Sequence, residues 1–282
     1  MSSADPKQST RTIIQAIRAA DSHLRSRHRL LAQEGQDTLC LLIYALSWLE
    51  LIAVGGLWVS GVLPAWGAVP LVALGLSVLH ELEHDLIHDL YFAHRPAVQD
   101  GLFAGIWLAK MSLNPWSRRH LHRYHHRVSG QAEDVEERLI GLGLPWGLRR
   151  LLLSLFPAGS LVVIPAIRRA VVDAMKRGVP GPATHHRPGF AIIRAVDGLF
   201  LLLPFAVLPA AWMGSPLATA LAVLWVLPNT LRHFSIVNYA LMDDVAMATI
   251  FSTILGNHLA HGFDPGLGKL VTPITEATID VY

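Results

Sequence analysis

Three histidines are spaced four residues apart directly after a long apolar stretch. They are His80, His84 and His88, and they follow the apolar residues 63–79. On a helix, residues four apart share one face, so the three imidazoles would be stacked one above the other. Imidazole is the commonest metal ligand in proteins. The spacing therefore predicts a metal site at the end of a membrane helix.

A second cluster lies about 40 residues further on, in the run from His120 to His126. On a helix His122, His125 and His126 fall at i, i+3 and i+4 and share a face, while His120 points elsewhere. The preceding Asn114-Pro115-Trp116 is a helix-start signal, because proline is tolerated in a first helical turn.

Two smaller groups complete the pattern. Asn229 and His233 come at the end of the last apolar run, and His258 and His261 lie in the tail. A single histidine on a helix is usually an ordinary polar residue. Four groups that all lie at or beyond the end of an apolar run together predict a metal centre.

The motifs are compatible with more than one kind of metal site. His80-Glu81-x-x-His84 matches the zinc-protease pattern, in which the glutamate is the general base. One zinc takes three protein ligands, which would leave most of the other histidines without a role. Glu81-x-x-His84 also resembles half of a soluble di-iron motif, but a second half is missing. Some eight imidazoles fit two first-row metals with positions left open for oxygen, and iron is the usual choice.

The elements that position these groups are membrane helices. Of the 282 residues 52% are hydrophobic and 16% are charged, against about 25% charged in an average soluble domain. Residues 38–79 contain one charge, Glu50, and residues 198–231 contain none. Each block is divided by a turn, so we expect four spans, at about 38–60, 63–84, 197–213 and 215–231. Glu50 is expected in the bundle interior beside a polar partner.

The fold predicted is all-α: an integral membrane protein of about four helices with a helical cap that carries the histidines. Residues 1–36 form a basic amphipathic segment without the apolar core of a signal peptide, and residues 37–282 form a single membrane domain. The single Cys40 excludes a disulfide within the chain and a cysteine-ligated iron–sulfur cluster.

The distribution of basic residues predicts the orientation. Of 23 Lys and Arg residues, six lie in 1–36, fifteen in 80–194 and two in 232–282. By the positive-inside rule both termini and all the histidine clusters face the cytoplasm. A net charge of +2 implies no nucleic-acid partner.

The motifs His80-x3-His84, His122-x2-His125-His126, Asn229-x3-His233 and His258-x2-His261 resemble those of the membrane fatty acid desaturase and hydroxylase superfamily. The resemblance covers roughly residues 75–235. It departs from the family at Gly262, where the pattern His-x-x-His-His would have its last histidine. The resemblance implies four spans, a cytoplasmic centre of two non-haem irons, and O2-dependent attack on an unactivated C–H bond of an acyl chain.

The resemblance also implies roles for individual residues. The predicted iron ligands are His80, His84, His122, His125, His126, His233, His258 and His261. Asn229 would act through a water, and His88, Glu81 and Asp85 would contact the ligands without binding the metal. Arg118, Arg119 and Arg123 are candidate anchors for the head group of the substrate.

The function expected from this resemblance is a fatty acyl desaturase of lipid metabolism. It would act on an acyl lipid or acyl thioester and take its electrons from a separate ferredoxin- or cytochrome-type donor. The alternatives are a fatty acid or alkane-type hydroxylase with the same site, an intramembrane zinc protease that uses His80, Glu81 and His84, and a membrane protein that keeps the fold without activity.

Overall fold

In the computed structural model of the chain, the described residues are 31–128, 131, 133–140, 148–155, 163–181 and 190–234, with scattered positions between 12 and 29. Chain contacts divide the protein into two units, one of residues 37–237 and one of residues 1–36 with 238–282. The described positions from Thr12 to Arg27 in the smaller unit are helical and exposed, and the amphipathic character of residues 1–36 stays a prediction. His258 and His261 lie outside the described residues.

The described part of the larger unit is helical. Three helices are long and apolar enough to cross a bilayer: α2 (Gln33–Val59), α3 (Ala65–Ile87) and α9, which runs over Phe190–Trp212 and whose span begins at Ala191. They coincide with three of the four predicted spans. Trp66 at the start of α3 and Trp212 at the end of α9 are 81% and 93% exposed, as expected of aromatic anchors at a membrane surface.

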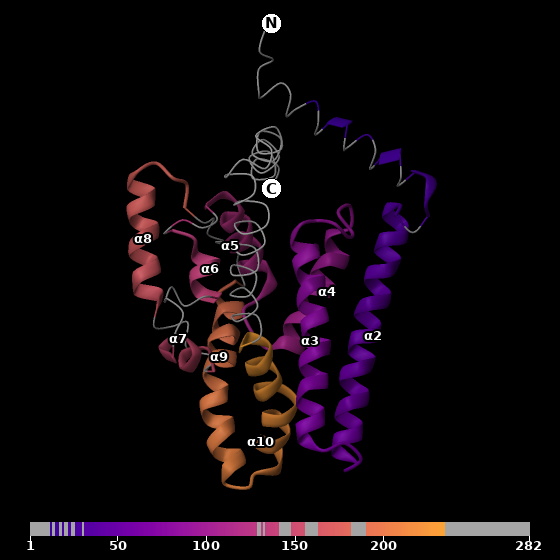
Figure 1. Ribbon diagram of the computed structural model, residues 1–282, viewed down its shortest axis with the longest axis vertical. Helices are drawn as coiled ribbons and strands as arrows, with labels where there is room; N and C mark the ends of the chain where they lie inside the picture. The colour runs from indigo at the N-terminus through magenta and orange to yellow at the C-terminus, as the bar shows by residue number, and fades with distance from the viewer. Residues whose placement is uncertain are drawn as a thin grey trace, which may run out of the picture. The chain divides into compact units, whose positions relative to one another are not determined.

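The fourth predicted span is helical but interrupted. It consists of α10 (Pro216–Leu221), the π-helical turn η2 (Ala222–Val226) and helical residues 227–234. A π turn carries one extra residue and is often found beside functional groups. Here it directly precedes Asn229, Arg232 and His233. Figure 1 shows α9 beside α10, and α2 beside α3, with both hairpin turns at the same end.

The remaining described helices of this unit lie toward the opposite end, where α3 finishes (Figure 1). They are α4 (Pro96–Lys110), α5 (Pro115–Val128), α6 (Val135–Ile140), α7 (Leu148–Ser154) and α8 (Ile164–Lys176). Helix α3 packs against α4, α5 and η2, and α6 packs against α5 and α8. A helical cap over one end of the spans was predicted, and its side of the membrane stays a prediction.

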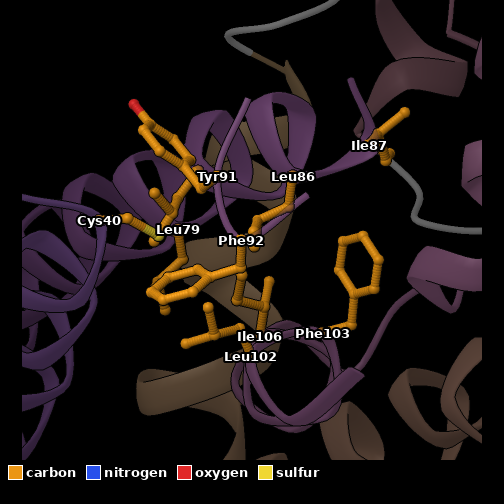
Figure 2. Packing of buried hydrophobic residues seen from close by; sticks show 10 residues of the cluster. Cys40, Leu79, Leu86, Ile87, Tyr91, Phe92, Leu102, Phe103 and Ile106 are labelled. Atoms are coloured by element: carbon orange, nitrogen blue, oxygen red, sulfur yellow. The ribbon is translucent and has the colours of Figure 1, made fainter. Parts of the chain in front are cut away.

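An apolar cluster fixes the end of α3 that carries the histidines. Cys40 of α2, Leu79 and Leu86 of α3, and Phe103 and Ile106 of α4 are all fully or almost fully buried in it. Figure 2 shows Cys40 beside Leu79, and Leu102 with Ile106 on the same side of the cluster. This packing holds α4 against α3. It therefore fixes the point at which the chain leaves α4 toward α5.

One polar residue of the spans does not meet the partner expected for it. Glu50 of α2 lies against Gly75 of α3, where the missing side chain leaves room for the carboxyl group. Both carboxyl oxygens are buried, and neither has a hydrogen-bond partner among the residues described. The expectation that Glu50 is inside the bundle is confirmed, whereas the expected partner is not found.

Candidate metal centre

Four histidine side chains converge at the junction of α3 and α5. His84 and His88 come from the end of α3, and His122 and His126 from α5. One nitrogen from each of the four rings lies within 4.8 Å of the others. Both pairs are four residues apart, so each helix presents two rings on one face. The i, i+4 pattern in the sequence thus becomes a four-nitrogen cluster only where the two helices meet.

Three of these nitrogens form a tight triangle. The Nε2 atoms of His88 and His122 are 2.9 Å apart, those of His122 and His126 are 3.0 Å apart, and those of His126 and His88 are 3.2 Å apart. Imidazole nitrogens bind a first-row metal at about 2.0–2.1 Å, which puts neighbouring ligands of one metal roughly 3 Å from each other. The spacing of the triangle therefore suits three ligands of a single ion.

Hydrogen bonds among the rings do not explain the triangle. His122 Nδ1 lies 2.6 Å from Glu136 Oε2 and donates its proton there, so its Nε2 is a bare acceptor. His88 and His126 would both have to donate to that one atom, and their own Nε2–H groups would then point at each other. A cation shared by three lone pairs satisfies all three contacts at once.

Protonation equilibria also favour ligand character. Burial, followed by the neighbouring imidazoles, lowers the pKa of His88 to about 4, and the same causes lower the pKa of His126 to about 4. Both rings are therefore neutral at pH 7 and carry a lone pair. Neutral imidazole is the form that binds metals.

Two buried carboxylates orient the rings of α5. Glu136 accepts from His122 Nδ1, and Asp134 Oδ2 lies 2.7 Å from His125 Nδ1. Burial acts to raise the pKa of Glu136, but the hydrogen bond from His122 and the charge of Arg118 lower it overall, so it stays ionised. A carboxylate on one ring nitrogen selects the tautomer whose other nitrogen is a ligand. His125 has this same arrangement beside the four-histidine cluster, its ring centroid 5.4 Å from that of His126.

His80 is not brought into the cluster. Its Nδ1 lies 3.0 Å from Lys110 Nζ and 3.3 Å from Arg118 Nη1. Both neighbours are donors, so Nδ1 is the acceptor and the proton of a neutral ring sits on Nε2. The lone pair of that tautomer is on Nδ1, where the two donors already engage it. Metal binding by His80 stays a prediction, and it would require a different protonation state.

Buried charges surround His80. Glu83 is fully buried and accepts from Lys110 and from Arg118, whose Nη1 is 3.0 Å from Glu83 Oε1. Arg118 also reaches Glu136, with Nε 3.5 Å from Oε1. Burial lowers the pKa of Lys110 to about 7, although the charge of Glu83 opposes this shift. The charge network links α3, α4, α5 and α6 beside the metal cluster.

Two adjoining cavities extend from this network. The first, the polar recess, has a volume of about 180 Å³ and is lined by His80, Lys110, Arg118, Glu136, Arg232 and His233, with apolar neighbours. The second, the apolar cavity, has a volume of about 410 Å³ and shares Lys110, Arg232 and His233 with the recess. Its wall is mostly apolar and includes Ile164, Phe200, Leu201, Pro204, Trp225 and Val226. Together they form a pocket with a charged end and a hydrocarbon-like end.

The groups predicted after the last apolar run line these cavities rather than the four-histidine cluster. His233 lines both cavities, and its Nε2 is buried without a hydrogen-bond partner among the described residues. Asn229 donates through Nδ2 to the carbonyl of Trp225 at 3.0 Å, while its buried Oδ1 has no partner in the described part of the chain. Asn229 therefore presents an available acceptor atom, and His233 an unengaged ring nitrogen, toward the cavities.

The structure separates the three arginines proposed as head-group anchors. Arg118 lines the polar recess, whereas Arg119 and Arg123 both pair with Asp89. Glu81 is exposed, and the four-histidine cluster includes His84 but neither His80 nor Glu81. Asp85 lies 3.5 Å from His84 Nδ1 and accepts from the Tyr91 hydroxyl at 3.2 Å.

Several residues that shape the site were not predicted from the sequence. Lys110, Arg232 and Asp197 were not singled out, and Asp134 and Glu136 were not assigned to the histidines. Lys110 ends the apolar residues 101–109, Arg232 ends the last apolar run, and Asp197 begins it. Charges at those ends were the available signal. His88 was expected to contact the ligands, but it belongs to the cluster itself.

Comparison with known proteins agrees with this architecture. The sequence profile of the family described as "Fatty acid desaturase" matches residues 60–267. The matched region includes α3, α5, both cavities and all the predicted ligands. Neither a curated protein nor a solved structure matches the chain. The profile covers well over half of the 282 residues, and the chain therefore belongs to the fatty acid desaturase family.

Proposed function

We propose that this protein is a membrane-bound, O2-dependent desaturase that introduces a double bond into a fatty acyl chain. The observation that carries the proposal is the triangle of Nε2 atoms from His88, His122 and His126, with His84 beside it. Family membership supports an oxidoreductase of the desaturase or hydroxylase type. The choice of desaturation over hydroxylation rests on the resemblance of the first two histidine motifs.

The residues of the cluster fit an iron ion. His84, His88, His122 and His126 would hold the first ion. For a second ion the predicted ligands are His125 and His233, together with His258 and His261. When bound, iron supplies the activation of O2 that breaking an alkyl C–H bond requires.

The protein's own contribution is positioning and exclusion of water. Glu136 and Asp134 hold the imidazoles of His122 and His125 in the metal-binding tautomer. The apolar cavity between α9 and η2 offers a dry surface for an alkyl chain, which has no polar group near the reacting carbon. The charged recess at its end offers contacts for a polar head group.

The electron balance implies a redox partner. Removing two hydrogens from neighbouring methylenes while O2 becomes two waters consumes two further electrons and two protons. The proposed source is a separate ferredoxin- or cytochrome-type protein on the cap side. The proposal places the cap side and both termini in the cytoplasm. The reason is that most Lys and Arg residues lie in residues 1–36 and 80–194.

The proposal is tested by expressing the full chain in a host of known fatty-acid composition and analysing its lipids by mass spectrometry. We expect new unsaturated chains with the wild type and none with His122→Ala or His88→Ala. His94→Ala is the matched control, because His94 is an exposed histidine outside the cluster and its loss should leave the products unchanged. Hydroxylated chains in place of unsaturated ones would identify the hydroxylase alternative. An unchanged lipid profile with wild type that holds its iron would refute both.

A further inference from the structure

A buried arginine that forms no ion pair with any described residue lies where the two cavities meet. Arg232 is 8% exposed and lines both the polar recess and the apolar cavity. Its Nε is buried and has no hydrogen-bond partner, and no ion pair joins Arg232 to another described residue. A guanidinium is always charged, and an unpaired buried charge is strongly unfavourable. Within the described part of the chain no ion pair balances the charge of Arg232, and an anion in the cavities would balance it.

The nearby carboxylates are already engaged by other groups. Glu83 accepts from Lys110 and Arg118, and Glu136 accepts from His122 and Arg118. Asp197, on the wall of the apolar cavity, accepts from Asn114 and from Trp107 Nε1. Glu136 and Asp197, which line the cavities, and the buried Glu83 thus each have their own donors. Glu83 and Glu81 act on Arg232 through their charge, but neither forms an ion pair with it.

The shape of the pocket selects the kind of anion. Beyond Arg232 the wall consists of Phe200, Leu201, Pro204, Trp225 and Val226, so a small inorganic anion would leave an apolar volume of about 410 Å³ unfilled. A hydrocarbon chain fills such a surface favourably. The complementary ligand is an amphiphile with an anionic head and an alkyl tail.

We infer that Arg232, together with Lys110 and Arg118, binds the carboxylate of a free fatty acid whose alkyl chain lies in the apolar cavity. The choice of a fatty acid among anionic amphiphiles rests on the proposed function. The substrate then carries a free carboxylate, and its carboxyl end points into the polar recess. A neutral ester would not complete the charge of Arg232.

The orientation has a consequence for the position of attack. The polar recess is bounded by Glu136, which contacts His122, and by His80, one helical turn before His84. The carboxyl end of the substrate therefore lies nearer the histidines than the methyl end. An anchored carboxylate also makes the enzyme count carbons from that end. Among chains of different length, the modified carbon should keep a constant distance from the carboxyl group.

The direct test is binding to the purified full chain in detergent, measured by equilibrium dialysis at pH 8. The probes are hexadecanoic acid and its methyl ester, and inorganic phosphate is used as a competitor. We expect the acid to bind about tenfold or more tightly than the ester, as charge-assisted hydrogen bonds predict. Phosphate should not displace the acid. Equal binding of acid and ester, or displacement by phosphate, would overturn the inference without any variant.

Variants test whether Arg232 causes the preference for the acid over the ester. Arg232→Gln should bring the acid and the ester to within about twofold of each other, and Lys110→Met should reduce the preference partly. Arg168→Gln is the matched control, since Arg168 is an exposed arginine on α8 that lines neither cavity, and it should keep the preference. Ester binding by Arg232→Gln at the wild-type level verifies that the cavity is intact. An Arg232→Gln protein that still prefers the acid would refute the assignment.

These results separate the inference from the proposed function. A host whose lipids stay unchanged, with an Arg232-dependent acid preference in the purified protein, would remove the desaturase and keep the carboxylate site. Oxidised lipids together with equal binding of acid and ester would support the proposed function and remove the carboxylate site. Double bonds placed at a constant distance from the methyl end would also overturn the head-first orientation.

Discussion

Glu136 of α6 and His122 of α5 are joined by a hydrogen bond of 2.6 Å between Oε2 and Nδ1, and both side chains are buried. Through this bond a carboxylate outside the triangle of nitrogens decides which nitrogen of His122 carries the lone pair. The same arrangement recurs between Asp134 and His125. The short segment after α5 therefore sets the tautomers of the candidate metal centre although it contributes no residue to the four-histidine cluster.

Replacing Glu136 should weaken metal binding without removing a ligand. Glu136→Ala frees His122 to take the other tautomer, and loss of such a partner typically costs 10–100-fold in metal affinity. The measurement is iron per chain during titration with a competing chelator. Asp173→Ala, which removes an exposed carboxylate on α8, is the control. Iron affinity that is the same in both variants would show that the Glu136–His122 bond has no part in the site.

Metal binding should stabilise the fold through the cluster. An ion that binds only the folded state at 100 times its dissociation constant adds about 2.7 kcal/mol to the free energy of unfolding. We expect Fe²⁺ or Co²⁺ to raise the melting temperature of the chelator-treated wild type in detergent. His126→Ala should lose that increase, whereas His94→Ala should keep it. An equal increase in all three proteins would place the stabilising ion elsewhere.

The hydrogen bond that joins Asp197 of α9 to Asn114 at the start of α5 should show energetic coupling. Asn114 Oδ1 accepts from the backbone N–H of Ser117 at 2.7 Å, which caps α5, while its Nδ2 donates to Asp197. Asn114→Ala should cost about 0.5–2 kcal/mol for the lost cap, and more because the half-buried Asp197 loses a donor. In a double-mutant cycle with Asp197→Ala, the two losses should be non-additive.

Asn114→Ser serves as the control for this cycle. Serine keeps an oxygen that caps the helix but cannot reach Asp197 with an amide, so it should recover the capping part only. Chemical unfolding in detergent measures each free energy. Strictly additive losses in the cycle would mean that Asn114 and Asp197 act independently.

Close packing between α2 and α4 should make two glycines of one helix respond in opposite ways. A side chain at Gly105 would overlap the Tyr44 hydroxyl group, whereas a side chain at Gly101, one turn earlier, meets nothing within 4 Å. Gly105→Ala should therefore destabilise the protein by about 1–3 kcal/mol. Gly101→Ala should be neutral or stabilising by about 0.5–1 kcal/mol, because alanine favours the helix. Thermal unfolding in detergent compares the two.

The same contact provides a rescue. Tyr44→Phe removes the hydroxyl that a Gly105 side chain would strike, so adding it to Gly105→Ala should recover part of the lost stability. Tyr44→Phe combined with Gly101→Ala should show no such gain. Rescue of both variants to the same extent would contradict the contact.

Much of the architecture followed from the sequence because a bilayer imposes simple rules. A span needs about 20 apolar residues, and α2, α3 and α9 lie where hydropathy placed them. The start of α5 at Pro115 and the shared faces of His84 with His88 and of His122 with His126 followed from local helix geometry. These properties depend only on residues that are neighbours along the chain.

The tertiary structure decided which of the histidines meet. Spacing alone makes His80 equivalent to His84, yet the end of α4 brings Lys110 beside His80 and leaves His88 to join the cluster. The carboxylates that set the tautomers, the burial of Arg232 and the cavity between α9 and η2 also depend on contacts between distant segments. A helical period specifies a face, but only the packing of several helices determines which charges and lone pairs that face encounters.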